Sequence, residues 1–170
     1  MEGLREGDFE LFLAEVIGDA VSVATRVPED QGLAEDAAVE AMARAHLRWR
    51  SLSADPYRRA WALRVAVNAA IDIQRSERRR RAREARAVTL VGGGEFEQES
   101  VDRVVLNAAL AKLSRRQREA VALRYLAGLS EHDAAGAMDL SPGSLKVRLL
   151  ALRGPDDHWC RPAARLPAHR

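Results

Sequence analysis

The sequence has almost no cysteine, since Cys160 is the single one among 170 residues. One cysteine excludes an internal disulfide framework and a zinc site built from several cysteines, and it fits a reducing cytoplasm. No apolar run approaches the ~20 residues that a helix needs to cross a bilayer. The acidic start, MEGLREGDFE, lacks the basic and then apolar pattern of a signal peptide. These absences predict a cytoplasmic protein without membrane insertion.

The sequence also lacks a recognisable catalytic centre. The histidines at 46, 132, 158 and 169 have no partners at metal-ligand spacing, and His158 with Cys160 supplies only two ligands. A glycine-rich phosphate loop and a nucleophile elbow are both missing. A hydrolase that uses Cys160 and a histidine is a rival class with almost no support. We therefore expect a protein that is not an enzyme and that has no cofactor and no metal.

Charge is distributed unevenly along the chain, although the net charge is only +2. Residues 1–45 hold 11 acids and 3 bases, whereas residues 46–90 hold 12 bases and 4 acids. An acidic front followed by a basic middle predicts two different partner surfaces. The basic part is the expected nucleic-acid side. The length of 170 residues indicates one medium domain or two small ones.

Three helices are predicted in the first half of the chain. The first covers residues 8–25 and begins at Asp8 as its N-cap. The second covers 33–50, with acids in its first turns and arginines in its last, as the helix dipole favours. After a short loop, a long third helix runs from about residue 57 into the arginines at 78–81. The apolar face of the first helix consists of Phe9, Phe12, Leu13, Val16 and Ile17.

The third helix carries two polar residues on a mostly apolar surface. Trp61, Val65 and Ile71 have helical spacing and are expected to pack in a core. Asn68 and Asp72 lie at i and i+4, where a polar side chain needs either solvent or a partner. Two interpretations stay open for this pair. In the first, the pair is purely structural, with an exposed face or a satisfied local hydrogen bond. In the second, the pair is a binding site.

The run ERRRRAREAR at 77–86 ends this helix. Charge runs are usually only solvated, but so many arginines on one element also suit contacts with phosphates. From 87 to about 99 the helical pattern fails, and three glycines at 92–94 indicate a flexible tether. The chain therefore divides into two helical modules around this linker. The tail at 154–170 is too rich in proline and polar residues to predict a fold.

The second module begins with a helix at 101–112, and a second helix follows at 115–126. Ser114 and Gln117 are three residues apart in front of that second helix, which is the spacing of a capping box. The residues expected to face inward from it are Val121, Leu123, Tyr125 and Leu126.

The stretch at 128–149 has the pattern of a helix-turn-helix. Gly128 suits the end of the preceding helix, Ser130 is a cap for a short helix of small residues, and Ser141 with Pro142 begins another. A plain helical hairpin is the ordinary alternative. Against it, the start Ser-Pro-Gly-Ser lets the N-terminus of the last helix approach a phosphate. That helix has an apolar stripe of Leu145, Leu149 and Leu152, with the cations Lys146 and Arg148 off the stripe.

These segments resemble the sigma factors of bacterial RNA polymerase, in the small extracytoplasmic-function group that has only regions two and four. Residues 34–49, AEDAAVEAMARAHLRW, are similar to the region-two helix that docks on the polymerase clamp helices. Residues 56–75 are similar to the segment that opens and reads the minus-ten element, and residues 113–149 to region four, which reads the minus-thirty-five element. The resemblance covers about 30–153. The residues that match the region-two pattern are Trp61, Arg64, Val65, Asn68, Ala70, Ile71 and Asp72.

The predicted fold is all-α, with two helical modules joined by a flexible linker and a helix-turn-helix in the C-terminal one. By resemblance, region two spans 1–86, the linker 87–100, region four 101–153 and the tail 154–170. The implied function is that of a sigma subunit that directs core RNA polymerase to promoter DNA, with an anti-sigma factor as a further candidate partner. The alternative is an autonomous helix-turn-helix regulator, which would leave the 61–72 segment without a purpose.

The resemblance also implies the residues at each interface. The sequence departs from the family pattern at Val147, where Ser or Thr is common, at Leu150, where a polar or aromatic reader is common, and at His46 in the clamp-binding helix. The expected polymerase-binding residues are Glu35, Asp36, Glu40, Arg44 and Arg48. The expected DNA-binding residues are Arg64, Asn68, Asp72, Arg75, Arg78, Arg79, Ser141, Ser144, Lys146, Val147, Arg148 and Leu150.

Overall fold

The computed structural model describes residues 3–27, 30–88 and 101–152. Within these ranges the regular structure is helical and strands are absent, so the predicted all-α fold is confirmed. None of the described helices combines the length and the apolar character that a membrane span requires. The predicted tail and the predicted linker lie outside these residues, except that residues 87 and 88 still belong to a helix.

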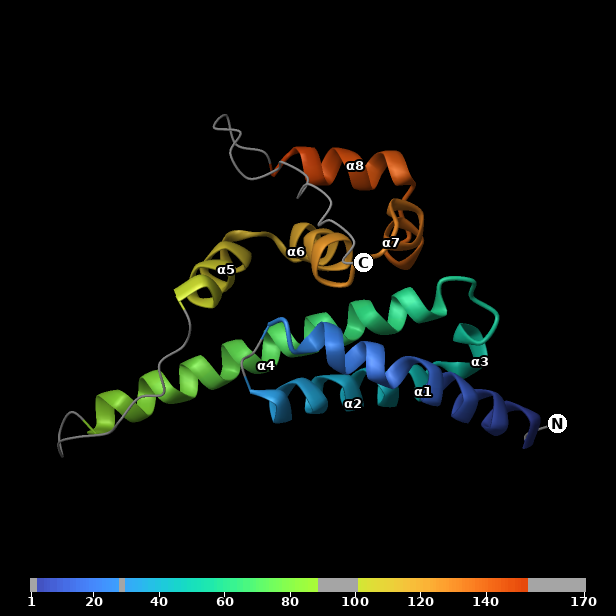
Figure 1. Ribbon diagram of the computed structural model, residues 1–170, viewed down its shortest axis with the longest axis horizontal. Coiled ribbons are helices and arrows are strands. Elements are labelled where there is room, and N and C mark those ends of the chain that lie inside the picture. The colour runs from blue at the N-terminus through green and yellow to red at the C-terminus, as the bar shows by residue number, and fades with distance from the viewer. Residues whose placement is uncertain (1–2, 28–29, 89–100, 153–170) are drawn as a thin grey trace, which may run out of the picture.

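The first module is a bundle of α1 (Gly3–Ala24), α2 (Gln31–Leu47) and α4 (Arg58–Val88), which contact one another (Figure 1). Helix α2 begins at an N-cap, because the carboxylate of Asp30 accepts a hydrogen bond from the Leu33 N–H at 3.2 Å. Small side chains on its inner face let the neighbouring helices come close. The alanines buried there are Ala34, Ala37, Ala38, Ala41 and Ala45.

An aromatic cluster closes one end of this bundle. The Trp49 ring lies 5.3 Å from the Phe9 ring and 5.0 Å from the Phe12 ring, measured between centroids. Burying side chains of this size contributes about 1.5–3 kcal/mol each. Trp49 belongs to α3 (Trp49–Leu52), a short helix directly after α2. The cluster therefore ties α1 to the chain between α2 and α4.

Two predicted boundaries in the first module are wrong. Helix α1 begins at Gly3, so Asp8 lies within the helix and is not its N-cap. The residues before Asp8 include no proline, and nothing in them stops the helix from extending. The second predicted helix, 33–50, is two helices that part at Arg48. This bend lets the indole of Trp49 enter the aromatic cluster, a contact that helical periodicity does not reveal.

The second module contains α5 (Val101–Lys112), α6 (Arg115–Val121), η1 (Ala122–Leu126), α7 (Glu131–Ala137) and α8 (Pro142–Leu150). The predicted capping box is confirmed: the Ser114 hydroxyl accepts from the Gln117 N–H, and the Gln117 carboxamide oxygen accepts from the Ser114 N–H.

Helix α6 continues into a single wider turn, the π-helix η1. In this turn the Ala127 N–H donates to the Ala122 carbonyl at 2.8 Å, five residues back. The wider turn rotates the following residues around the helix axis. Tyr125 was expected to face inward and is 57% exposed instead, whereas Leu123 is buried as expected.

Helices α7 and α8 form the predicted helix-turn-helix. Ser130 accepts from the Asp133 N–H at 3.0 Å, and Ser141 accepts from the Ser144 N–H at 3.2 Å, so both helices are capped. The chain reverses at two residues with positive φ, Gly128 at 64° and Asp139 at 56°. Aspartate is among the few residues with a side chain that adopt this conformation readily.

The two modules pack against each other. Helices α6 and α7, with η1 between them, contact the first part of α4 (Figure 1). The arginine-rich end of α4 projects beyond α2 in the same view. The middle of α4 and the helix-turn-helix are both candidate DNA-binding elements. They belong to different modules, on either side of the contact between the modules.

Candidate nucleic-acid interface

Asn68, in the middle of α4, points at the second module. Its side-chain amide donates a hydrogen bond to the Glu119 carboxylate of α6 at 3.2 Å. Asp72, one turn further, is exposed, and Arg75 is partly buried. The sequence left open whether this pair is a satisfied hydrogen bond or exposed face, or a binding site. In the structure Asn68 is bonded to a residue of the other module, whereas Asp72 faces solvent.

Glu119 is a buried carboxylate at the centre of this contact. It is 5% exposed and accepts hydrogen bonds from Asn68, from Arg115 at 3.2 Å and from Arg116 at 3.4 Å. A buried carboxylate is costly unless such partners satisfy its oxygens. The cost explains why two arginines precede it on α6 at i−4 and i−3. Replacing any of these partners would leave part of the charge uncompensated.

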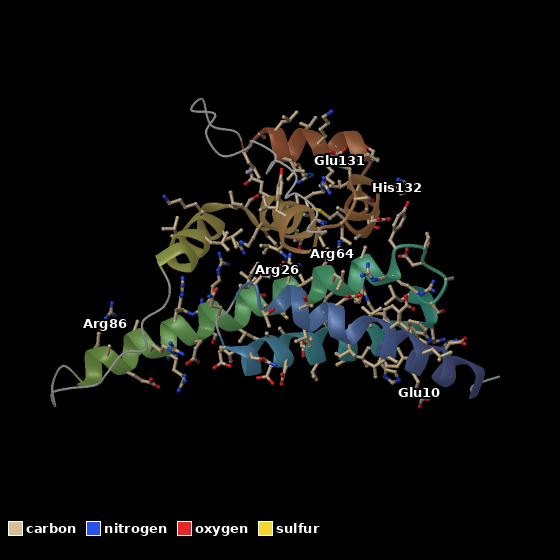
Figure 2. The ribbon with its side chains drawn as sticks, viewed as in Figure 1. Glu10, Arg26, Arg64, Arg86, Glu131 and His132 are labelled. Atoms are coloured by element: carbon tan, nitrogen blue, oxygen red, sulfur yellow. The ribbon has the colours of Figure 1, made fainter. Side chains whose placement is uncertain are left out.

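Arg64 lies one turn before Asn68 and is partly buried between the modules (Figure 2). Desolvation lowers the pKa of its guanidinium, while the charges of Glu119 and Asp139 oppose that change. Within the described part of the chain, no hydrogen bond or ion pair is formed by this guanidinium. A partly buried guanidinium without a bonded carboxylate is suited to bind an external anion, such as a phosphate.

Arg64 and Asn68 line a pocket of about 630 Å³ that both modules form. Arg44 and Arg48 border it from the side of α2, and Arg48 lies 5.9 Å from the centre of the Trp61 ring. The pocket is therefore cationic, with one aromatic wall. The remaining residues around it are Leu47, Val65, Arg115, Arg116, Glu119 and Asp139.

A second contact between the modules lies at the start of α4. A Cβ added to Gly136 of α7 would lie 2.5 Å from three atoms of the Tyr57 ring, so the ring packs directly on the glycine backbone. The Tyr57 hydroxyl is 2.9 Å from His132 Nε2. At the other end of the contact, the guanidinium of Arg26 donates to the Leu126 carbonyl. Only a residue without a side chain fits at position 136.

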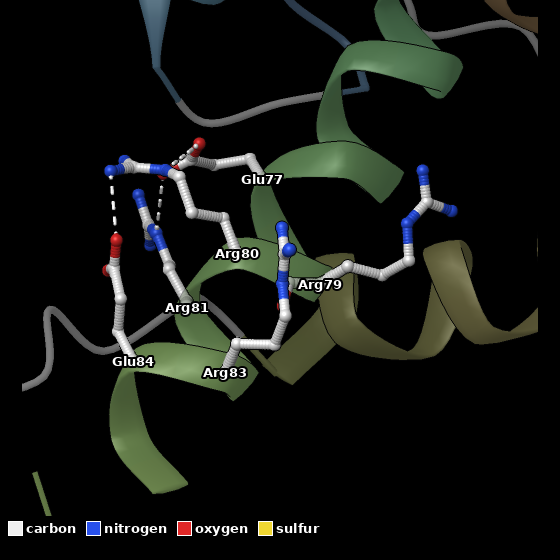
Figure 3. Close-up of polar contacts among 6 residues, drawn as sticks. All are labelled: Glu77, Arg79, Arg80, Arg81, Arg83 and Glu84. Carbon is white, nitrogen blue, oxygen red and sulfur yellow. Dashed lines mark hydrogen bonds and ion pairs between the residues drawn. The ribbon is translucent and has the colours of Figure 1, made fainter. Parts of the chain in front are cut away.

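The arginine run at the end of α4 is partly neutralised by its own acids (Figure 3). Arg80 bridges Glu77 at 2.5 Å and Glu84 at 3.2 Å, and Arg81 contacts Glu77 at 3.3 Å. The hydrogen bond from Arg80 is the main cause that lowers the pKa of Glu77. Figure 3 shows Arg79 directed away from this network. Two of the expected DNA-binding residues, Arg78 and Arg79, lie near the start of this run, where Arg78 is partly buried and Arg79 is exposed.

The helix-turn-helix presents one exposed face on α8. Val147 is 66% exposed and Lys146 is exposed beside it. Arg148 is partly buried, and its Nε is buried without a hydrogen-bond partner. Leu145 is fully buried, which fixes the opposite face toward the module core. The other expected DNA-binding residues on this element, Ser141, Ser144 and Leu150, are exposed.

The outer face of α2 combines charges with exposed apolar side chains. Glu40 and Arg44 form an ion pair at 2.8 Å, and Glu35 accepts a hydrogen bond from Gln31. Val39 is 62% and Leu47 84% exposed. These two side chains lie eight residues apart, hence on the same face of the helix. Asp36 is also exposed on α2, and Arg48 follows its end.

Sequence reasoning missed Glu119 and the two arginines that bind it. Their spacing of four and three residues is visible in the sequence, but nothing in it predicts that the carboxylate is buried against another module. It also missed Tyr57 and Gly136, whose contact joins residues far apart in the chain. In the described ranges, no three His, Cys, Asp or Glu side chains are grouped so as to hold a metal ion.

Two family models match the chain, one in each module. Sigma-70 region 2 matches residues 13–80, and Sigma-70, region 4 matches residues 103–153. The ECF RNA polymerase sigma factor SigC of Mycobacterium tuberculosis is 34% identical over 137 residues, which cover 75% of this chain and 74% of that protein. The probable RNA polymerase sigma-C factor of Mycobacterium bovis matches to the same extent.

Two solved structures share the fold. The sigma factor RpoE of Bartonella quintana, in complex with the anti-sigma factor NepR, is 26% identical. Its TM-score is 0.50, and the match covers 86% of this chain and 92% of that one. CnrH, in complex with the cytosolic domain of CnrY, has a TM-score of 0.51 at 23% identity, with 85% and 82% of the two chains covered. The second likeness concerns the fold alone.

Proposed function

Because the chain belongs to the extracytoplasmic-function group of RNA polymerase sigma factors, and so serves transcription initiation, we propose a division of this work between its two modules. The first module docks on core RNA polymerase and reads the downstream promoter element. The second reads the upstream element with its helix-turn-helix. The observation that carries this proposal is the match of both region models, together with the relative at 34% identity.

We assign downstream recognition to Arg64 and Asn68. Both lie on one face of α4 and line the same cationic pocket, which has an aromatic wall. A carboxamide both donates and accepts, so Asn68 can meet the edge of an unpaired base, and a guanidinium suits the adjacent phosphate. Asp72, Arg75, Arg78 and Arg79 continue this surface toward the end of the helix.

Recognition in this form requires the modules to separate. The side-chain amide of Asn68 is hydrogen-bonded to Glu119, and residues of α6 lie close to Arg64. A base can reach Asn68 only after Glu119 withdraws, because the amide hydrogen that points at the carboxylate would otherwise stay engaged. The packed arrangement is therefore the state of the free protein in this proposal, and the modules separate on the promoter.

Upstream recognition is assigned to α8. Ser144, Lys146, Val147 and Leu150 are exposed on it, and the capped N-terminus has small residues that allow a close approach to phosphate. Val147 offers an apolar contact of the kind that a thymine methyl accepts. Arg148, with its partly buried stem, and Ser141 at the N-cap complete the surface.

Polymerase docking is assigned to the outer face of α2. Glu35, Asp36, Glu40, Arg44 and Arg48 supply mixed charge, which suits a charged partner surface. The exposed Val39 and Leu47 add apolar area that is unusual on a helix facing only water. Val39→Asp should therefore weaken binding to core polymerase. Leu11→Asp is the matched control, since Leu11 is 73% exposed on α1, outside this face.

The proposal also includes an anti-sigma partner, a cytoplasmic location and the absence of catalytic chemistry. The relative from Bartonella quintana was solved with an anti-sigma factor, which supports the first of these by analogy.

The deciding experiment is a mobility-shift titration on a selected promoter, with and without core polymerase, at physiological salt. Specific binding should require core polymerase. The rival function, an autonomous helix-turn-helix regulator, predicts nanomolar specific binding by the isolated chain that core polymerase does not improve. That result would overturn the proposal.

A further inference from the structure

The pocket between the modules holds more positive charge than its carboxylates neutralise. Five guanidinium groups line it, from Arg44, Arg48, Arg64, Arg115 and Arg116, against the carboxylates of Glu119 and Asp139. Five positive and two negative groups in the lining leave a formal charge of +3, and the ion pair of Arg44 with Glu40 reduces it to +2. Like charges gathered around one pocket repel each other, and this repulsion opposes the packing of the modules.

The two carboxylates form no hydrogen bond or ion pair with Arg64 among the described residues. Glu119 is already bonded to Arg115, Arg116 and Asn68. Asp139 is exposed at the turn of the helix-turn-helix. Arg64 is left with only longer-range attraction to them, and burial lowers its pKa. The unmet charge therefore centres on Arg64, with Arg48 nearby on the face of Trp61.

We propose that this pocket binds a soluble polyphosphate anion, either inorganic or the phosphate chain of a nucleotide, and that the bound anion holds the two modules together. Guanidinium forks match phosphate oxygens in pairs, which gives the strongest hydrogen bonds available to a protein. The pocket volume of about 630 Å³ lies in the range of ordinary small-molecule sites, roughly 300–1,000 Å³. The Trp61 ring is the feature that would favour a nucleotide over a bare polyphosphate.

The anion would stabilise the packed arrangement by linkage. Arg64 comes from the first module and Arg115 and Arg116 from the second, so the complete set of donors exists only while the modules are packed. A ligand that binds one state alone shifts the equilibrium toward that state. The anion would also occupy Arg64 and keep Asn68 covered by the second module, and so compete with promoter DNA. This competition rests on the proposed function, whereas anion binding does not.

The first test is isothermal titration calorimetry of the full chain with sodium tripolyphosphate, ATP and AMP, at a constant ionic strength of about 0.15 M. The pocket variant is Arg115→Ala with Arg116→Ala. The control is Arg50→Ala with Arg58→Ala, which removes the same charge from exposed positions outside the pocket. Circular dichroism and thermal denaturation check that each variant is folded.

We expect tripolyphosphate and ATP to bind the wild type and the control equally, and the pocket variant roughly tenfold or more weakly, since charge-assisted bonds are lost. AMP should bind weakly. Tighter binding of ATP than of tripolyphosphate would identify a nucleotide site, and equal binding a site for the phosphate chain alone. Equal loss in both variants, or no binding at millimolar ligand, overturns the proposal.

The second test measures the linkage by small-angle X-ray scattering. Saturating tripolyphosphate should reduce the radius of gyration of the wild type and leave that of the pocket variant unchanged. Binding without compaction would overturn the claim that the anion holds the modules together. Both tests use no promoter and no polymerase, so a failure of the proposed function in the mobility-shift assay is distinguishable from a failure here.

Discussion

At the scale of single residues, the most informative contact is the hydrogen bond from Asn68 to Glu119. It joins residues that are 51 positions apart and that belong to different modules. A partly buried asparagine amide needs a hydrogen-bond partner, and in this structure a carboxylate provides it. We propose that the same amide meets a promoter base, in which case one side chain would serve two mutually exclusive partners.

We expect Asn68→Ala to slow the opening of promoter DNA while leaving the initial binding of duplex DNA by the holoenzyme nearly intact. The physical reason is that the amide is proposed to contact only an unpaired base. Permanganate footprinting would detect this as reduced thymine reactivity in the bubble. Ser76→Ala, an exposed position on the same helix, is the control. Equal reactivity in all three proteins would indicate that Asn68 is purely structural.

Glu77 supports a prediction about pH. The hydrogen bond from Arg80 lowers the pKa of Glu77, so its ionised form is favoured in the folded helix. A carboxyl with a depressed folded pKa contributes stability above its unfolded pKa, and this contribution is lost as the pH falls through the folded value. Carbon-13 NMR titration should therefore give Glu77 a midpoint below the ordinary value of about 4.3. In Arg80→Ala the midpoint should rise, and an unchanged midpoint would contradict the assignment.

At the scale of helices, the contact of α7 with the start of α4 depends on the absence of a side chain at Gly136. In a helix, glycine costs about 0.5–1 kcal/mol relative to alanine, so its presence inside α7 needs a compensating reason. The reason is the Tyr57 ring, which occupies the space that a Cβ would take. The ring is held in turn by its hydroxyl contact with His132.

Gly136→Ala should destabilise the packed protein by about 1–3 kcal/mol, the usual cost of overpacking. The same substitution in a Tyr57→Ala background should instead stabilise it by up to about 1 kcal/mol, through helix propensity. Urea denaturation of the four proteins in this cycle measures both effects. Gly18→Ala in α1 is the control, because a Cβ there meets nothing within 4 Å. The same sign for Gly136→Ala in both backgrounds would contradict the packing argument.

The recognition helix α8 gives a prediction about salt. Lys146 is exposed and is proposed to contact phosphate, so Lys146→Ala should weaken promoter binding by the holoenzyme evenly across sequences. The slope of log binding constant against log salt should fall by about 0.9 for one lost phosphate contact. A mobility-shift titration over several salt concentrations measures it. Lys112→Ala, exposed at the end of α5, should leave the slope unchanged; a slope insensitive to Lys146 would remove this residue from the interface.

At the scale of the whole molecule, the structure joins two modules through a contact that hides part of the proposed promoter-reading surface. The contact combines an apolar core shared by both modules with a few polar bonds and one close approach, and arginines surround its pocket. We propose that polymerase and promoter DNA replace this contact with their own. Once both modules are fixed on one polymerase, each raises the effective concentration of the other at the promoter, and avidity can increase by ~10²–10⁴.

Binding to core polymerase should therefore separate the modules. Spin labels at Ala54 and Glu131, both exposed, report the distance between the turn before α4 and the start of α7 in a Cys160→Ser background. Double electron–electron resonance should give a short distance in the free chain and a longer one in the holoenzyme. An identical distribution in the two samples would mean that the modules read DNA while still packed. The background substitution removes the chain's single native thiol.

Local patterns in the sequence were sufficient for much of the fold. The capping box at Ser114, the caps at Ser130 and Ser141, and the reversal at Gly128 involve residues within a few positions of one another. Their geometry depends on backbone groups that short-range rules describe well. The same is true of the all-α class and of the helix-turn-helix.

Tertiary structure alone decided how these helices meet. The bend at Arg48 depends on the aromatic cluster, and the wider turn of η1 is not encoded in a simple apolar repeat. The partner of Asn68, the glycine under Tyr57 and the arginine-lined pocket all arise where residues distant in sequence pack together. Helical periodicity reports which face of a helix is apolar, but not which other helix covers it. The choice of partner depends on side-chain shape and on the pairing of buried charges, which exist only once the modules are in contact.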